Sequence, residues 1–303
     1  MQTFLNALFT GGSRGAIYAL VALGLVLVWR GAGLINFAQM GQAMFSAYVA
    51  STLIAQGYNY WIAFFVALIV GAALGAAIDI LVIRPLKKKS GTAILGSPSM
   101  RDAIPVIASL GILGILQSVA GMIWAGSERG FPAPVSTVAL KVGGNTMPFT
   151  YFDLFTIGIV ILILIATSLF LARTSVGLAM RASALNSEVA RLSGIRTRSI
   201  RTLGWVISGA VASVAGLLVT PATNISPNSL DLILIIGFTA CVIGGLDSLL
   251  GSVIGGFLLG FVIAFISVYD IPEDIFIAIF LILMGIMFFR PQGLFGSEVG
   301  RRV

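Results

Sequence analysis

The sequence predicts an all-α protein, a polytopic bundle of transmembrane helices, on the basis of three observations. Hydrophobic side chains make up 58% of the 303 residues, and the mean hydropathy is +1.06. Only 10% of the residues are charged, against about 25% in an average soluble domain. Apolar stretches that are long enough, or nearly long enough, to cross a bilayer recur along the whole chain. This composition excludes a soluble enzyme, a disordered chain and a coiled coil.

The positions of the charges divide the chain into nine candidate spans, since a transmembrane helix needs roughly 20 mostly apolar residues. The charge-free stretches are residues 15–29, 31–78, 103–127, 154–172, 202–230, 232–246, 248–269 and 275–289. The second stretch has room for two helices, separated by an evident turn at Gln56, Gly57, Tyr58 and Asn59. We therefore expect eight or nine spans, in one transmembrane domain that covers residues 1–303.

The basic residues predict the orientation of these spans. If Arg30, the loop 84–101, the segment 173–201 and the end from Arg290 lie on one side, that side holds 15 of the 18 Lys and Arg residues. The other side keeps Arg14, Arg129 and Lys141, together with the acidic cluster Asp270, Glu273 and Asp274. Because positive residues are retained in the cytoplasm, we expect the N-terminus outside and the C-terminus in the cytoplasm. The net charge of +7 then reflects topology, and we expect no binding to nucleic acid.

Two of the spans are short and a third is rich in polar residues. Residues 15–29 and 232–246 contain 15 uncharged residues each, about 22 Å of helix against a hydrocarbon core of about 30 Å. Such segments are typical of broken helices that line a polar pathway, but they also result from misjudged span boundaries or from close helix packing through glycine. The polar candidates for a translocation pathway are Asn36, Gln39, Gln42 and Thr239, whose alternative role is hydrogen bonding between helices.

The segment 173–201 has the pattern of an amphipathic helix on the cytoplasmic side. Thr174 or Ser175 is a suitable cap for its start, and Gly194 suits its end. An apolar stripe at helical spacing consists of Leu178, Ala182, Leu185, Val189 and Leu192, with Ser183, Ser187 and Arg191 facing away from it. We therefore expect one short helix whose stripe lies on the membrane surface, packs against the chain's own helix ends, or enters a groove on another protein.

The sequence contains no recognisable catalytic motif. It has no histidine, no Gly-x-x-x-x-Gly-Lys-Ser/Thr phosphate loop and no Gly-x-Ser-x-Gly elbow, and its one cysteine, Cys241, lies in an apolar run. We therefore expect neither catalysis nor a metal or cofactor in this chain. Asp79, the one acid inside a predicted span, is expected to pair with Arg84 near the cytoplasmic end. We expect Lys87, Lys88 and Lys89 to act as a topology anchor.

Four stretches of the chain resemble one known family. They are the loop Gly177-Leu-Ala-Met-Arg-Ala182 with Asn186 and the run from Ala190 to Ile195, the start at residues 16–27 and 33–38, Ile83-Arg-Pro-Leu86, and Arg290-Pro-Gln-Gly-Leu-Phe-Gly296. Together they resemble the permeases of branched-chain amino-acid ATP-binding cassette (ABC) transporters, over nearly the whole chain. One departure is that residues 39–42 are the neutral run Gln-Met-Gly-Gln, where the family often has a His-Gly-Glu type run.

The resemblance implies half of the pore of an importer in the bacterial inner membrane. It implies a paralogous permease subunit, two ATPase subunits that hold ATP and magnesium, and an extracytoplasmic solute-binding protein as partners. It also implies that the segment 173–201 is a coupling segment that docks on an ATPase, through Gly177, Arg181, Ala182, Asn186, Ala190, Leu192 and Gly194. The implied solute is a branched-chain amino acid, with other amino acids, urea or a short amide as alternatives. A second functional class, an autonomous secondary transporter or channel, stays open at this point.

Overall fold

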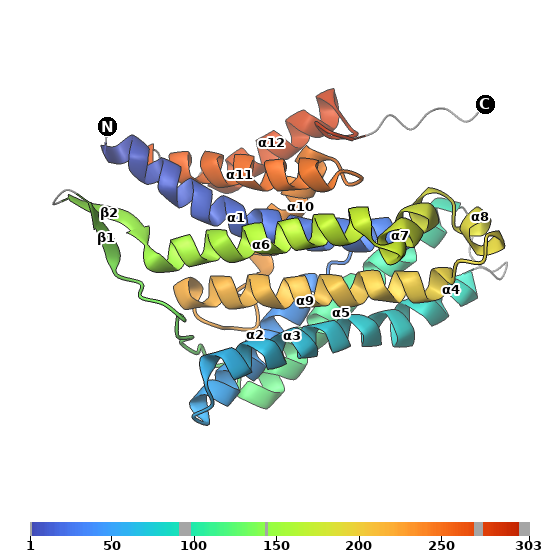
Figure 1. Cartoon of the computed structure of the whole chain (residues 1–303), viewed down its shortest axis with the longest axis horizontal. Coiled ribbons are helices and arrows are strands. Elements are labelled where there is room, and N and C mark those ends of the chain that lie inside the picture. The colour runs from blue at the N-terminus through green and yellow to red at the C-terminus, as the bar shows by residue number, and fades with distance from the viewer. Residues whose placement is uncertain (1, 91–97, 143–144, 270–274, 297–303) are drawn as a thin grey trace. The chain divides into compact units, whose positions relative to one another are not determined.

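The computed structural model describes residues 2–90, 98–142, 145–269 and 275–296, and these residues are mostly helical (Figure 1). The acidic cluster Asp270, Glu273 and Asp274 lies outside the described residues. The helices are α1 (Gln2–Ala32), α2 (Gln39–Ala55), α3 (Tyr60–Ala77), the π-helix η1 (Ile78–Ile83), α4 (Arg84–Ser90), α5 (Pro98–Trp124), α6 (Tyr151–Arg173), α7 (Ser175–Leu185), α8 (Ser187–Leu192), α9 (Thr197–Thr223), α10 (Asp231–Gly244), α11 (Leu249–Tyr269) and α12 (Ile275–Phe289).

Each of the nine predicted spans corresponds to one helix. In the described part of the chain, six helices are long and apolar enough to cross a membrane, namely α1, α3 with its continuation to Lys87, α5, α6, α9 and α11. The apolar helices α10 and α12 are shorter, and α2 has 17 residues. The protein is therefore a multi-pass membrane protein, while the total of eight or nine crossings stays a prediction.

The prediction of a short first span is wrong. Helix α1 has 31 residues and continues through Arg14, whose side chain is exposed. Because arginine is a good helix former, a charge at this position delimits the apolar stretch without ending the helix. The shortness of the span at residues 232–246 is confirmed, since α10 has only 14 residues.

The turn predicted between the second and third spans is confirmed. Gly57 has φ +89°, a conformation that favours glycine, and the side chain of Asn59 caps α3 by accepting a hydrogen bond of 2.8 Å from the Trp61 amide. A local exception to the all-α prediction follows α5, where β1 (Ala139–Val142) pairs with β2 (Asn145–Thr150) as an antiparallel hairpin.

The described chain packs as two compact units, each built from segments that are distant in sequence. Unit 1 comprises residues 1–26, 132–165 and 235–303, and unit 2 comprises residues 27–131 and 166–234. In unit 1, α11 packs on α1. In unit 2, α2, α3 and α9 pack side by side (Figure 1). The prediction of a single permease domain stays a prediction.

Glycines set the distance between the packed helices in both units. A Cβ placed on Gly260 of α11 would lie 2.6 Å from the Gly11 carbonyl oxygen of α1, and one on Gly75 of α3 would lie 2.9 Å from the carbonyl carbon of Trp205 in α9. Such close approach through small residues is a usual means of helix packing in membranes. These glycines therefore serve the packing role that the sequence left as one of the alternatives.

Candidate functional site

The helical part of the predicted coupling segment begins and ends where the sequence predicts, but it is two helices rather than one. The Thr174 hydroxyl accepts a hydrogen bond of 3.0 Å from the Gly177 amide and so caps α7. At the other end Gly194 has φ +84°. Between these two ends, the backbone of Asn186 is extended rather than helical. Its side chain accepts hydrogen bonds from the amides of Glu188 and Val189 at 3.0 and 3.1 Å. Asparagine is a strong N-cap residue, so it ends α7 and starts α8.

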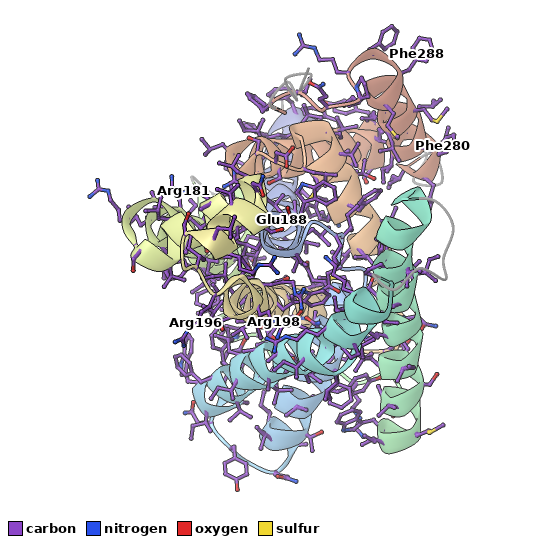
Figure 2. All side chains as sticks on the ribbon, turned by 90° about the vertical axis from the view of Figure 1, so that its right-hand side faces the viewer. Arg181, Glu188, Arg196, Arg198, Phe280 and Phe288 are labelled. Carbon is purple, nitrogen blue, oxygen red and sulfur yellow. The ribbon has the colours of Figure 1, made fainter. Side chains whose placement is uncertain are left out.

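The faces of α7 and α8 differ in their exposure. Ser183, expected to face away from the apolar stripe, is buried, together with Gly177, Met180 and Ala190. The stripe itself is exposed: the exposed fraction is 81% at Leu185 and 86% at Leu192. The charged residues Arg181 on α7 and Glu188 on α8 are also exposed (Figure 2). The helix pair therefore packs on its own chain through Gly177, Met180, Ser183 and Ala190 and leaves its leucines uncovered.

The buried face of α7 touches the ends of two long helices. A Cβ on Gly177 would lie 2.6 Å from the Phe170 carbonyl oxygen, so α7 presses on the last turn of α6. The methyl group of Met180 lies within 4 Å of the positions that a Cβ would take on Gly31 of α1 and on Gly204 of α9. Any displacement of α7 therefore acts directly on these helix ends.

Of the other predicted coupling residues, Ala190 is buried in α8, Ala182 and Asn186 are half-buried, and Gly194 is exposed. Residues Arg191 and Leu192 form the exposed side of the short α8. The seven residues thus share one continuous segment, and it is their exposure that differs.

Three of the four pathway candidates lie in unit 2 and are completely buried, namely Asn36, Gln39 and Gln42. Gln39 and Gln42 belong to a polar seam between α2 and α9, which we define as Gln39, Gln42 and Ser46 facing Ser208 and Ser213, while Asn36 precedes α2. Ser213 donates a hydrogen bond of 2.9 Å to Ser46, and Ser208 donates one of 3.5 Å to the side-chain amide oxygen of Gln39. For Gln39, the alternative role of hydrogen bonding between helices is therefore observed.

Asn36 and Gln42 differ from Gln39, since their side-chain amides have no hydrogen-bond partner within the described residues although they are buried. A Cβ on Gly209 would lie 3.3 Å from the Gln42 oxygen, so Gln42 faces the backbone of α9 where no side chain intervenes. Buried polar groups are nearly always paired, and unpaired ones are costly in an apolar interior. The two amides therefore have spare hydrogen-bonding capacity inside unit 2.

The fourth candidate, Thr239, lies in unit 1 on α10. It is buried, and its hydroxyl donates 2.9 Å to the Ile235 carbonyl oxygen of the same helix. The structure thus groups Asn36, Gln39 and Gln42 in one unit and places Thr239 in the other.

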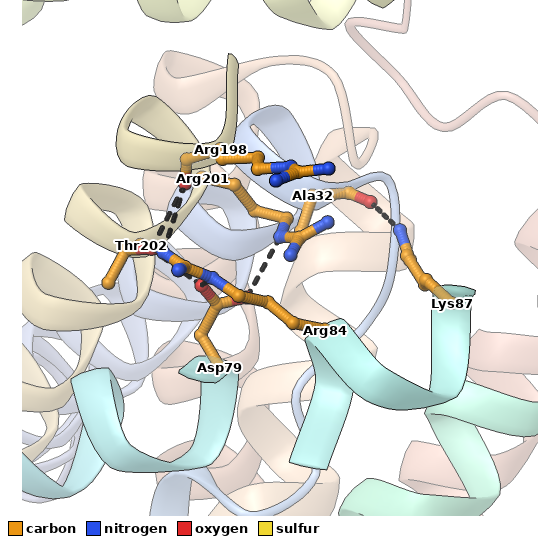
Figure 3. A network of polar contacts seen from close by, with 7 residues as sticks. All are labelled: Ala32, Asp79, Arg84, Lys87, Arg198, Arg201 and Thr202. Atoms are coloured by element: carbon orange, nitrogen blue, oxygen red, sulfur yellow. Dashed lines mark hydrogen bonds and ion pairs between the residues drawn. The ribbon is translucent and has the colours of Figure 1, made fainter. Parts of the chain in front are cut away.

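The predicted pair of Asp79 and Arg84 is confirmed as part of a larger ionic centre (Figure 3). Asp79 is wholly buried, and its two oxygens accept from Arg84 Nε at 3.0 Å and from Arg201 Nε at 2.8 Å. Thr202 donates a third hydrogen bond of 2.6 Å. The carboxylate lies in the π-helix η1, whose wider turn departs from the α-helical pattern. Helices α3, η1 and α4 follow one another without a break, and we call them the α3–η1–α4 rod. Asp79 therefore joins this rod to the first turns of α9.

Arg201 and Thr202 were not identified as partners of Asp79 from the sequence, because 122 and 123 residues separate them from it. A second, half-buried polar contact was also missed: Gln117 of α5 donates a hydrogen bond of 2.8 Å to Asp231 at the start of α10. Within the described ranges, no group of three or more His, Cys, Asp or Glu side chains could hold a metal ion.

The lysine cluster has one clear structural role. Lys87 Nζ donates 2.6 Å to the Ala32 carbonyl oxygen at the end of α1 (Figure 3). A cation at the C-terminus of a helix satisfies a carbonyl and is favoured by the helix dipole. Lys87 therefore fixes the end of α1 to α4.

Comparison with known proteins identifies the family. The family described as "Branched-chain amino acid transport system / permease component" matches residues 7–289. The chain is 31% identical to the high-affinity branched-chain amino acid transport system permease protein BraD of Pseudomonas aeruginosa, over 99% of this chain and 98% of BraD. It is 29% identical to the corresponding protein LivH of Escherichia coli, over 99% of this chain and 98% of LivH. The fructose import permease protein FruF of Bifidobacterium longum is also 29% identical, over 80% of this chain and 64% of FruF.

These matches span nearly the whole chain and agree with its buried, glycine-packed apolar helices. The family consists of transport permease subunits and not of catalytic enzymes. The chain belongs to the family of permease components of branched-chain amino acid transport systems.

Proposed function

We propose that this chain is one half of the pore of an ABC importer, which moves a branched-chain amino acid into the cytoplasm by alternating access. Its partners would be a paralogous permease subunit, two ATPase subunits that bind ATP and magnesium, and an extracytoplasmic solute-binding protein. The chain would lie in the bacterial inner membrane as one permease domain with eight or nine crossings, its N-terminus outside and its C-terminus in the cytoplasm.

The observation that supports this proposal best is the two-sided coupling segment. Gly177 packs on α6 and Met180 on α9 and the end of α1, while Leu185, Val189 and Leu192 are exposed next to Glu188. An amphipathic helix with exposed apolar anchors at this spacing is suited to a groove on a partner protein. Because Met180 lies against Gly31 and Gly204, an ATPase that pulls on α7 and α8 would move the ends of two spans.

The solute route would pass the polar seam of unit 2. Asn36 and Gln42 have unpaired amides, and an amide can donate to a carboxylate and accept from an ammonium group. Gln39 and Thr239 would also line this route, although their side chains already form hydrogen bonds within the protein. A relative of similar identity is named a fructose import permease, so the solute needs a direct test against other amino acids, urea and short amides.

The test is ATP-driven leucine uptake and ATPase stimulation in proteoliposomes that contain the permease with its ATPase subunits and binding protein. Leu192→Asp places a charge on the exposed stripe and should lower both activities about tenfold, with membrane insertion unchanged, since burying an unpaired charge is strongly unfavourable. Ser187→Asp is the matched control, because it adds the same charge at the first turn of α8, where the helix dipole favours it.

Equal activity of the two variants would refute the coupling assignment. Uptake that persists without ATP, together with purified protein that never retains an ATPase, would instead support an autonomous secondary transporter or channel. Arg181→Glu provides a second check, since it reverses an exposed charge of α7 and should lower ATPase stimulation without altering folding.

A further inference from the structure

A basic pocket opens between the α4 end of the α3–η1–α4 rod and the first turns of α9. It has a volume of about 380 Å³ and is lined by Arg84, Pro85, Lys87, Arg198 and Arg201. All of these residues belong to unit 2, and four of the five are cations. We propose that this pocket binds a phosphate group, supplied by the headgroup of an anionic phospholipid.

The charges of the pocket are unbalanced. The lining holds four positive side chains and no acidic one. Asp79 does not line the pocket and is fully buried behind Arg84 and Arg201, which it binds through their Nε atoms. A site with an excess of positive charge at close quarters attracts an anion, and guanidinium groups match the geometry of phosphate oxygens.

Donors remain available on the side that faces the cavity. Arg84 Nη2 is engaged by Thr202 and by the Arg198 carbonyl oxygen, and Lys87 is held at the end of α1. By contrast, neither the Arg198 guanidinium nor the Nη groups of Arg201 hydrogen-bond to any residue that the structure describes. Figure 3 shows these two guanidinium groups lying beside each other above the Asp79 centre. Together they present several N–H donors toward one opening.

The position of the pocket along the helices favours a lipid as the source of the phosphate. Arg84 and Lys87 lie at the end of the candidate span Tyr60–Lys87, and Arg198 and Arg201 lie in the first turns of the span Thr197–Thr223. Span ends lie at the level of the lipid headgroups. Basic pockets between transmembrane helices at this level are typical sites for anionic lipid headgroups. A bound headgroup would bridge α4 and the first turns of α9.

The experiment measures lipid binding to the purified protein in mild detergent by native mass spectrometry, with phosphatidylglycerol and cardiolipin as probes and phosphatidylcholine as the neutral comparison. Arg198→Gln removes an exposed side chain that bonds nothing in the described chain, so folding should be preserved. We expect it to weaken binding of the anionic lipids about fivefold, and Lys87→Gln/Arg198→Gln about thirtyfold, from the usual contribution of each basic residue near a membrane surface. Binding of phosphatidylcholine should not change.

Arg196→Gln is the matched control, because Arg196 is equally exposed and lies two residues away but does not line the pocket. Equal weakening by Arg196→Gln and Arg198→Gln would overturn the proposal, since it would indicate general charge attraction. Unchanged lipid binding in the double variant, with no effect of phosphate either, would overturn it as well.

A parallel measurement separates the two sources of phosphate. The thermal unfolding midpoint is followed in inorganic phosphate against chloride at equal ionic strength. If phosphate alone raises the midpoint and Lys87→Gln/Arg198→Gln abolishes the rise, the phosphate site is supported with a soluble ligand. If the double variant loses retention of an ATPase subunit while lipid and phosphate binding are unchanged, the pocket is a protein contact and the proposal fails.

Discussion

In both compact units helices pack closely through small residues, but the units differ in the polar side chains between their helices. In unit 1, α1 and α11 meet through Gly11, Gly15 and Ala19 on one side and Gly256 and Gly260 on the other. In unit 2, α3 and α9 meet through Gly71, Gly75 and Gly209, yet the adjacent contact of α2 with α9 is the polar seam. Small residues alone are therefore sufficient to pack helices in this protein, and the polar side chains of unit 2 need another explanation.

The difference indicates that unit 2 keeps polar groups for something other than stability. A hydrogen bond between membrane helices contributes only about 0.6 kcal/mol, and two amides of unit 2, on Asn36 and Gln42, make no such bond in the described chain. An interior built only for stability would replace them with apolar residues of similar size. Four predictions test this contrast.

The largest effect is expected where a side chain would collide with a backbone. Gly260→Val in unit 1 and Gly75→Val in unit 2 should each destabilise the fold by about 3 kcal/mol or more, since the atoms they meet are main-chain atoms that cannot move aside. Folded yield and the thermal unfolding midpoint measure the loss. Gly12→Val is the control, because a Cβ on Gly12 meets nothing within 4 Å. Tolerance of Gly260→Val would contradict the close packing of α1 on α11.

The next effect compares one bonded carboxylate in each unit, Asp79, which is buried, and Asp153, which is half-buried. Asp79→Asn removes the charge that holds Arg84 and Arg201, and should cost roughly 2–3 kcal/mol, less than for a fully buried pair because Arg84 is partly exposed. Asp153 of unit 1 accepts instead from neutral donors, Ser13 Oγ at 2.5 Å and the Thr150 amide at 2.8 Å. Asp153→Asn should therefore cost about 1 kcal/mol. A larger loss of stability for Asp153→Asn than for Asp79→Asn would contradict the stronger role given to the Asp79 centre.

The ionic centre around Asp79 illustrates how much of the structure could be predicted from the sequence. Asp79 and Arg84 are only five residues apart, so a pair between them could be expected from sequence proximity, although it is the wider turn of the π-helix η1 that brings them together. Arg201 is brought in only by the packing of α9. The positions of the helices and the turn at Gly57 were predictable because apolar length and turn residues are local signals. The hairpin of β1 and β2 was not, since its pairing has no alternating apolar pattern to indicate it.

The coupling segment shows the same limit more sharply. The spacing of Leu178, Leu185 and Leu192 revealed an apolar stripe, but spacing does not indicate whether a stripe is covered by its own chain. Here the exposed stripe and the buried Met180 lie on different faces of α7, because α7 docks through Gly177 and Met180. Only the packing of α7 against α6 and α9 distinguishes the two faces.

The third prediction separates transport from stability within unit 2. Gln42→Leu should lower leucine uptake about tenfold, because it removes a group that would bond the solute, while the thermal midpoint stays the same or rises. A rise is expected because the amide has no partner in the described chain and leucine is apolar. A lower midpoint with unchanged uptake would instead make Gln42 a structural residue.

The smallest effect concerns the bonded part of the same seam. Ser213→Ala removes the 2.9 Å hydrogen bond to Ser46 and should cost about 0.6 kcal/mol, with uptake within twofold of the unaltered protein. A double-mutant cycle with Ser46→Ala isolates the contact, since each single change removes the same bond and the coupling energy should equal its whole contribution. A coupling energy near zero would mean that Ser213 bonds only the Gly209 carbonyl oxygen of its own helix, which it also contacts at 3.0 Å. In that case the seam of unit 2 would be no better bonded than the apolar contact of α1 with α11, and its polar residues would all be available to the solute.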